Sequence, residues 1–373
     1  MKFLINISNI VMGGAIQVAK SFVIETSNIR NNQDHYLIVY NPKIINFDNI
    51  KSSNKLNFKK VYNSPAKLKN RSRVNKMLYS FERDFNPDIV FTMFGPSYWI
   101  PKAKHVCGFA DGWVYYQNSI AYDKLNLLDR LKRKVLNFYK IQRLRKESSN
   151  FILETDDAKE KFKEVLAMKK SKFYTVSNTC NSVFYEQIRF KRLKIFKKDF
   201  FNLLNISSYY PHKNLEIIND LTKNISSKEK IRFYLTLPEK VFKSKFYDNE
   251  NIINLGPQKI EDCPNLYYNC DAVFLPTILE TFSASYVEAM KMNKPILTSN
   301  LDFATKLCHN AAEYFNPLDI ESIIQKILLI KKDKKRYNQL IKLGNIRLKN
   351  FPDSTLKTKK YIRICKDVLT LEN

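Results

Sequence analysis

Short apolar segments alternate with helix-like segments through the first half of the chain. Segments of strand length cover residues 3–11, 35–41, 87–94, 104–110, 150–155 and 172–178. Between the first two, residues 15–26 place Ile16, Ala19, Phe22 and Val23 on one face of a helix. Strands that alternate with helices predict a parallel sheet with helices on both faces.

The pattern starts again in the second half of the chain. Strands are expected at 200–208, 231–238, 251–256, 271–277 and 294–300, and helices at 214–224, 263–270, 283–292 and 320–332. The basic segment 186–199 lacks their apolar density and is the expected linker. The prediction is an α/β fold with two Rossmann-like domains, 1–185 and 200–352, whose ligand lies in a cleft at the strands' carboxyl ends. A helix at 353–373 is expected to follow, with packing back on the N-terminal domain as one option.

Length and composition agree with this organisation. The 373 residues exceed one ordinary core, and 44% hydrophobic with 27% charged residues is typical of a globular chain. No run of eighteen apolar residues occurs, so no spanning helix is expected. Asn6, Ser8 and Asn9 interrupt the N-terminal apolar segment, which favours a buried strand over a signal peptide. Six cysteines without a C-x-x-C pair, and four histidines, indicate a reduced cytoplasmic protein without zinc spacing.

The charge is strongly unbalanced, with 63 basic and 36 acidic residues and a net charge of +27. Such a field attracts polyanions, namely nucleic acid, phosphorylated ligands or an anionic membrane face. Residues 123–150 predict a helix with a strongly cationic face and an apolar stripe of Leu128, Leu131, Val135 and Phe138. The stripe fits a core-facing helix, the commoner case, or a helix that docks on an anionic membrane.

Two glutamates follow the predicted strand 271–277. A helix that starts near residues 283–285 offers free backbone N–H groups and a positive dipole end, which suit phosphate oxygens. Glu280 would lie beside that site, and Glu288, about one turn into the helix, could accept both hydroxyls of a ribose. The alternatives are a solvated loop charge for Glu280 and a capping box that joins Ser285 to Glu288.

The whole passage 275–300 resembles the donor-site signature of the glycosyltransferase family 4 group, which comprises retaining enzymes with the GT-B fold. The residues in register are Pro276, Thr277, Glu280, Phe282, Glu288, Ala289, Met290, Pro295 and Ile296. The signature often has glycines where Thr281 and Ser283 stand, so the approach of the backbone to the sugar would differ here.

Weaker resemblances extend to the rest of the chain. Lys213 matches a lysine that contacts the donor diphosphate in the family, whereas Ser208 stands where an arginine is expected. Asn178 matches the asparagine in the segment that closes the N-terminal domain. For Lys213 alone, a solvated loop lysine is the alternative.

In the N-terminal half, Gly13 and Gly14 resemble the family's glycine-rich loop, which faces the donor phosphate and the acceptor. A tight turn would explain the same two glycines. Asp111 lies near the end of the fourth strand, where the family commonly has a histidine. Asp111 would hold the sugar hydroxyls or the acceptor, or it simply forms a turn with Gly112. His105, at the start of that strand, is expected to be structural.

The resemblance implies a retaining glycosyltransferase of the hexosyltransferase type. It would transfer a sugar from a nucleoside diphosphate, a UDP-sugar first, to a lipid-linked or envelope polysaccharide intermediate (O-antigen, capsule or lipopolysaccharide). The enzyme would be bacterial and peripheral on the cytoplasmic face of the membrane. The implied catalytic residues are Glu280, Lys213 and Asp111, and the implied donor contacts are Glu288, Phe282, Ser283, Ala284, Ser208, Gly13, Gly14 and Asn178. No Asp-x-Asp motif occurs, so no metal and no other cofactor is expected.

Two other classes remain open from the sequence. A non-catalytic GT-B homologue that binds nucleotide sugars or a partner subunit fits the departures at Ser208, Thr281 and Ser283. A nucleic-acid-binding protein fits the charge alone. Because the chain lacks a recognisable helix-turn-helix, RNA-binding or zinc motif, nucleic acid is not an expected partner.

Overall fold

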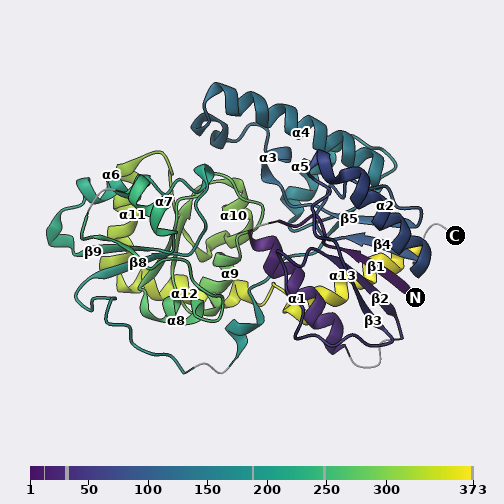
Figure 1. Cartoon of the computed structure of the whole chain (residues 1–373). Coiled ribbons are helices and arrows are strands. Elements are labelled where there is room, and N and C mark those ends of the chain that lie inside the picture. Colours follow the sequence, from purple (N-terminus) through teal and green to yellow (C-terminus); the bar gives the residue numbers. More distant parts are fainter. Residues whose placement is uncertain (12, 30–32, 187–188, 247–248, 371–373) are drawn as a thin grey trace. The chain divides into compact units, whose positions relative to one another are not determined.

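The computed structural model describes residues 1–370 except 12, 30–32, 187–188 and 247–248 (Figure 1). The chain divides into a first unit of residues 1–117, 128–178 and 352–373 and a second unit of residues 118–127 and 179–351. Each unit contains one parallel sheet, so the predicted α/β class is confirmed. Residues 187–188 of the expected linker and 371–373 of the expected last helix lie outside the described residues. The expected ligand cleft stays a prediction.

The first unit contains a seven-stranded sheet in the order β3-β2-β1-β4-β5-β6-β7. The strands are β1 (Lys2–Asn6), β2 (His35–Tyr40), β3 (Leu56–Lys60), β4 (Ile89–Thr92), β5 (Lys104–Gly108), β6 (Asn150–Leu153) and β7 (Lys172–Thr175). Six of them coincide with the expected apolar segments. The sequence pattern did not predict β3, an edge strand in which Asn57, Lys59 and Lys60 break the apolar run.

Alternate residues of these strands pack on opposite faces of the sheet. Phe3 and Phe91 face one cluster with α1 (Gly14–Asn28), whereas Leu4 and Val90 face another with α2 (Leu68–Phe85). Both faces are therefore covered, which explains why the strands form nearly continuous apolar runs. Residues 3–6 are buried within this core, as expected for a first strand.

The remaining helices of the first unit include one from the end of the described chain. They are α3 (Gly112–Tyr115), α4 (Leu127–Glu147), α5 (Asp156–Leu166) and α13 (Ser354–Thr370). Tyr361 of α13 packs against Phe22 of α1 and Phe91 of β4, with ring centroids 6.0 and 5.3 Å apart. The chain thus returns to the first unit after residue 351.

The second unit contains a six-stranded sheet in the order β10-β9-β8-β11-β12-β13. The strands are β8 (Phe201–Asn205), β9 (Ile231–Leu235), β10 (Ile252–Asn254), β11 (Ala272–Leu275), β12 (Ile296–Ser299) and β13 (Glu313–Phe315). The helices are α6 (Ile217–Asn224), α7 (Glu239–Lys245), α8 (Cys263–Asn269), α9 (Ala284–Lys291), α10 (Asp302–Cys308), α11 (Ile320–Lys332) and α12 (Lys334–Leu348). Short 3₁₀ turns are η1 (Ile120–Lys124), η2 (Ser182–Tyr185), η3 (Pro211–Lys213), η4 (Ser227–Glu229) and η5 (His309–Ala311).

The second unit differs from the expected domain limits at two places. It begins at Thr179, and the expected linker packs on it: Lys191 N–H donates to Asn265 Oδ1 at 2.8 Å, and Phe196 stacks on Tyr234 at 4.1 Å. It also includes residues 118–127, which the sequence pattern places in the N-terminal domain. Ser119 in this segment donates to the carbonyl of Ile278 at 3.2 Å, and η1 packs on η3.

Candidate active site

The loop that follows β11 is held against η3. The amide of Ile278 and the hydroxyl of Thr277 both donate to the carbonyl of His212, at 2.8 and 3.1 Å. The hydroxyl of Thr277 also lies 3.2 Å from the carbonyl of Leu279. These bonds join two loops at the carboxyl edge of the second sheet. They fix the backbone on either side of the two residues expected to be catalytic.

Lys213 and Glu280 form an ion pair at that edge. Lys213 Nζ donates to Glu280 Oε2 at 2.9 Å, and each side chain is 16% exposed. Neither residue is a solvated loop charge, so both surface-charge alternatives are wrong. The sequence motifs assign the two residues separate roles, and the structure joins them directly.

Helix α9 begins close to this pair. Its N-cap is Ser283, whose side chain makes no capping hydrogen bond, and Ala284 is its first residue. Phe282 is buried, with its ring 6.0 Å from that of Phe351. A donor contact by Phe282 would therefore come from its backbone. The uncapped first turn agrees with the expected phosphate site at a helix start.

Glu288 lies inside α9 and is buried. The hydroxyl of Tyr267 donates to Glu288 Oε2 at 2.7 Å. Burial raises the pKa of the Glu288 carboxyl to about 7, against the hydrogen bond from Tyr267, which lowers it. The capping-box alternative is wrong, because the helix begins before Ser285 and Glu288 meets Tyr267 instead of the backbone at the helix start.

Ser208 lies in the loop between β8 and η3 and is exposed. The neighbouring Ser207 hydroxyl donates to Asn205 Oδ1 at 2.6 Å. The stacked rings of Tyr210 and His212 follow in the same loop, with centroids 5.4 Å apart. Ser208 therefore occupies the carboxyl edge of the sheet, as its sequence position suggests.

The first unit holds the other expected site residues. Gly13 has a φ of +76°, which favours glycine, and it precedes Gly14, the first residue of α1. A side chain added at either glycine would meet nothing within 4 Å, so this loop borders open space. A close approach of a ligand to the backbone is possible at both positions.

Asp111 and Asn178 are both engaged within the first unit. Asp111 caps α3 by accepting from the amide of Trp113 at 3.2 Å, and it also pairs with Lys140 of α4. Asn178 donates to Glu154 Oε1 and accepts from Lys357 of α13, each at 2.9 Å. The turn expected at Asp111 is thus present as a helix cap, and a ligand role for either residue stays a prediction.

His105 is a structural residue, as the sequence analysis expects. It is buried, with Nδ1 2.7 Å from the carbonyl of Glu147 and Nε2 2.9 Å from Thr92 Oγ1. Burial lowers the pKa of His105 to about 4, whereas the hydrogen bond to Glu147 raises it. The imidazole is therefore neutral at ordinary pH.

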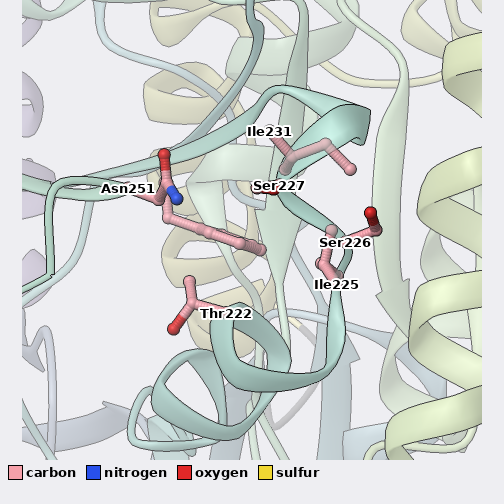
Figure 2. A pocket seen from close by; sticks show the side chains of 7 residues that line it. Thr222, Ile225, Ser226, Ser227, Ile231 and Asn251 are labelled. Carbon is pink, nitrogen blue, oxygen red and sulfur yellow. The ribbon is translucent and has the colours of Figure 1, made fainter.

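A small surface pocket lies at the opposite edge of the second sheet (Figure 2). It is lined by Thr222, Ile225, Ser226, Ser227, Ile231, Phe233 and Asn251, none of which is charged. Ile231 is the first residue of β9, so the pocket adjoins the amino ends of the strands. It is separate from the residues that gather around Lys213 and Glu280.

Sequence reasoning missed two contributors to the site. Tyr267 was expected only as part of the helix 263–270, and Ser119 was expected in the N-terminal domain. Both reach the site through contacts distant in sequence. The described residues also contain no group of three or more His, Cys, Asp or Glu side chains placed to hold a metal.

The sequence of residues 186–346 matches the family model of glycosyl transferases group 1. The match lies within the second unit, which is similar to this family over these residues. The matched stretch contains Lys213, Glu280 and Glu288. The narrower family 4 assignment stays a prediction. No curated protein matches the chain in sequence.

Solved structures with the same fold cover nearly the whole chain. Sucrose-phosphate synthase from Thermosynechococcus elongatus has a TM-score of 0.74 at 12% identity, over 99% of each chain. HepE from Anabaena, in complex with UDP-glucose, has a TM-score of 0.71 at 13% identity, over 99% of this chain and 100% of that one. WaaG, a glycosyltransferase involved in lipopolysaccharide biosynthesis, has a TM-score of 0.74 at 14% identity, over 98% and 99%. These likenesses show the GT-B fold.

Proposed function

We propose that the chain is a retaining glycosyltransferase of the hexosyl type that uses a nucleoside-diphosphate sugar. The observation that carries this proposal is the Lys213–Glu280 pair beside the uncapped start of α9, with Glu288 buried further along the helix. A cation, free backbone N–H groups and two carboxylates at one strand edge suit the phosphate, sugar and ribose parts of such a donor.

The proposed reaction assigns a role to each of these groups. The bond between the anomeric carbon and the diphosphate oxygen breaks, and the acceptor oxygen bonds to that carbon on the same face. The acceptor proton passes to an oxygen of the leaving phosphate. Lys213 and the N–H groups of Phe282 to Ala284 stabilise the charge that develops on the diphosphate. Glu280 orients the sugar hydroxyls, Glu288 holds the ribose, and no metal is needed.

The first unit would supply the rest of the site. Gly13 and Gly14 border open space at the start of α1, which suits a loop that faces the donor phosphate. Asp111 would hold hydroxyls of the transferred sugar or of the acceptor, with Lys140 beside it. Asn178 is proposed to act from the end of β7, where Lys357 and Glu154 fix its amide.

A UDP-sugar is the first donor to test, because HepE, with the same fold, was solved with UDP-glucose. A thermal-shift panel of UDP-, GDP- and dTDP-sugars should show a rise in melting temperature with one nucleotide and a smaller rise for Glu288→Gln. NMR of the product should then show a retained anomeric configuration. A panel in which no nucleotide shifts the melting temperature would rule out donor binding.

A non-catalytic nucleotide-sugar-binding subunit is the second candidate. Ser208 in place of an arginine, and Thr281 and Ser283 in place of glycines, favour it. Release of UDP from the preferred UDP-sugar, by hydrolysis or transfer, separates the two. Binding without release after prolonged incubation with candidate acceptors would favour the subunit.

Helix α4 supports a membrane-associated acceptor. Its apolar stripe is not core-facing: Leu128, Leu131, Val135 and Phe138 are 69, 60, 70 and 64% exposed. Residues of the same helix that are buried, such as Ile141 and Leu144, lie in its second half. Exposed apolar side chains among Arg130, Lys132, Arg133 and Lys134 are typical of a helix that lies in an anionic membrane surface.

We therefore place the protein on the cytoplasmic face of a bacterial membrane, acting on a lipid-linked envelope glycan such as a lipopolysaccharide, O-antigen or capsule intermediate. WaaG, which has this fold, is involved in lipopolysaccharide biosynthesis. None of the described helices is long and apolar enough to cross a bilayer. We propose that the contact with the membrane is peripheral and is made by α4.

Vesicle binding tests the role of α4. The double variant Leu131→Asp, Val135→Asp should lose at least about tenfold in affinity for phosphatidylglycerol vesicles, because each exposed side chain would bury apolar surface on docking. Folding should be unaffected, since both positions are exposed. Ile346→Asp, at an exposed apolar position on α12, is the matched control and should bind normally. Equal binding by wild type and the double variant would contradict the proposal.

A further inference from the structure

Tyr267 is placed between two side chains of α9. Its hydroxyl donates to Glu288 Oε2 at 2.7 Å, and Tyr267 itself is fully buried. Burial and the neighbouring Glu288 raise the pKa of the Tyr267 hydroxyl well above its usual value, whereas a hydrogen bond from Ser285 lowers it. Ser285 and Glu288 are three residues apart on one face of α9, so Ser285 also lies on the side of the helix that influences the pKa of the Tyr267 hydroxyl. Tyr267 remains protonated and is a donor to Glu288.

The surroundings of this pair contain other neutral groups. Phe184 of η2 packs edge-on against the ring of Tyr267, with centroids 5.6 Å apart. Burial raises the pKa of the Cys263 thiol of α8 to about 12, and Glu288 adds to that rise. Burial likewise raises the pKa of the Cys180 thiol to about 11; a hydrogen bond with Tyr185 lowers it and Glu288 raises it. The groups that face Glu288 are thus Tyr267 and Cys263 from α8 and Cys180 from the segment that opens the second unit.

We propose that Tyr267 is a positioning residue for donor binding, which holds Glu288 in the orientation and ionised state that accept the donor's ribose hydroxyls. This inference rests on the proposed function of Glu288. It adds a residue that never needs to touch the donor and acts only through the carboxylate. The neutral surroundings make the hydroxyl of Tyr267 important, because it supplies the hydrogen bond that favours the charged form of Glu288.

Donor affinity is expected to fall on acidification, because Glu288 must be ionised to accept the ribose hydroxyls. Donor binding that needs the Glu288 carboxylate is present above the pKa of that group and is lost as the pH falls through about 7. Removal of the Tyr267 hydroxyl takes away a stabilising bond to the carboxylate, so the loss should begin at a higher pH. The shape of the ring is kept in Tyr267→Phe, so packing against Phe184 should survive.

The test compares Tyr267→Phe with Tyr234→Phe. Tyr234 is equally buried in the same unit, and its hydroxyl donates to the carbonyl of Ile195 at 2.9 Å. For Tyr267→Phe we expect the KM for the UDP-sugar to rise about tenfold, kcat to change little, and the acidic limb of kcat/KM to move up by about one pH unit. Tyr234→Phe should leave the KM and the pH profile at their wild-type values.

The outcomes separate this inference from the proposed function. If Glu288→Gln leaves UDP affinity unchanged in titration calorimetry, the role of Glu288 in the proposed function fails. If Glu288→Gln weakens UDP binding while Tyr267→Phe changes only the melting temperature, Tyr267 is structural and the inference is overturned. Should Tyr267→Phe not fold, Ser285→Ala gives a second test: a shift of the acidic limb in the same direction supports the inference, and an unmoved limb overturns it.

Discussion

Each unit contains a lysine–carboxylate pair at the carboxyl edge of its sheet, and the two pairs differ in the other contacts that the carboxylate makes. Lys213 and Glu280 come from two loops, and both side chains are 16% exposed. Lys140 and Asp111 are similarly covered, at 16 and 21%, but Asp111 also caps α3. The two carboxylates are thus similarly covered but make different contacts. Because Asp111 also completes a helix start, we expect more of its role to be structural than in the case of Glu280.

The largest expected effect distinguishes these two carboxylates. Glu280→Gln should lower kcat about 10²–10³-fold, because it removes an oriented charge from the transition state. The melting temperature should change much less than kcat, because the glutamine side chain keeps an oxygen that can accept from Lys213 Nζ. Asp111→Asn, which keeps a capping side chain, should lower turnover only about tenfold. Steady-state kinetics with the preferred UDP-sugar measures both.

Glu313→Gln is the control for charge removal in the second unit. Glu313 pairs with Lys326 and Arg336 at 2.7 and 2.8 Å, and it begins β13 at the amino edge of the sheet. This change should lower stability and leave turnover intact. Equal losses of kcat in Glu280→Gln and Asp111→Asn would remove the difference between the two units.

Two buried titratable groups should give the units opposite pH dependences of stability. His105 has a pKa of about 4 when folded, so its stabilisation is present above its unfolded pKa of about 6.5 and is lost as the pH falls through about 4. Glu288 has a folded pKa of about 7, so its contribution is present below about 4.5 and is lost as the pH rises through about 7. Each contribution is about 3 kcal/mol at most.

Urea unfolding between about pH 4 and pH 8 checks both signs. His105→Gln should lose less stability than wild type on acidification, and Glu288→Gln should lose less on a rise in pH. Parallel pH profiles for wild type and either variant would show that the altered group does not titrate differently in the folded and unfolded chains.

The smallest expected effect concerns the missing arginine. Ser208→Arg would place a second cation in the loop that leads to Lys213, and we expect UDP to bind about threefold to tenfold more tightly. Ser226→Arg, in the pocket at the opposite strand edge, is the control and should leave UDP affinity unchanged. An unaltered affinity in Ser208→Arg would indicate that this loop does not contact the diphosphate.

The sequence predicted the local features of the second unit well. Short sequence patterns predict a strand at 271–277 and a helix start near 283, and the structure has β11 and α9 there. The loops that carry Lys213 and Glu280 lie next to each other. The contact between Glu288 and Tyr267 could not be predicted, because it joins two helices through tertiary packing. The Lys213–Glu280 pair, 67 residues apart, required the fold for the same reason.

The limits of pattern reasoning are clearest in α4 and α12. An apolar stripe at helical spacing predicts a helix, but it does not say whether the stripe has a protein partner, and that of α4 is exposed. Helix α12 was not predicted, since its basic residues obscure a face on which only Leu340 and Gly344 are fully covered. Strand β13 is three residues long and begins with Glu313, too short for a clear alternation.

The return of α13 to the first unit affects the order in which the protein can fold during synthesis. Tyr361, Ile362, Cys365 and Val368 complete the apolar cluster around Phe22. The ribosome makes these residues after the whole second unit, although the first unit begins at residue 1. Until then α1 covers that face of the amino-terminal sheet without α13, so part of the apolar cluster stays exposed while the later half of the chain is made.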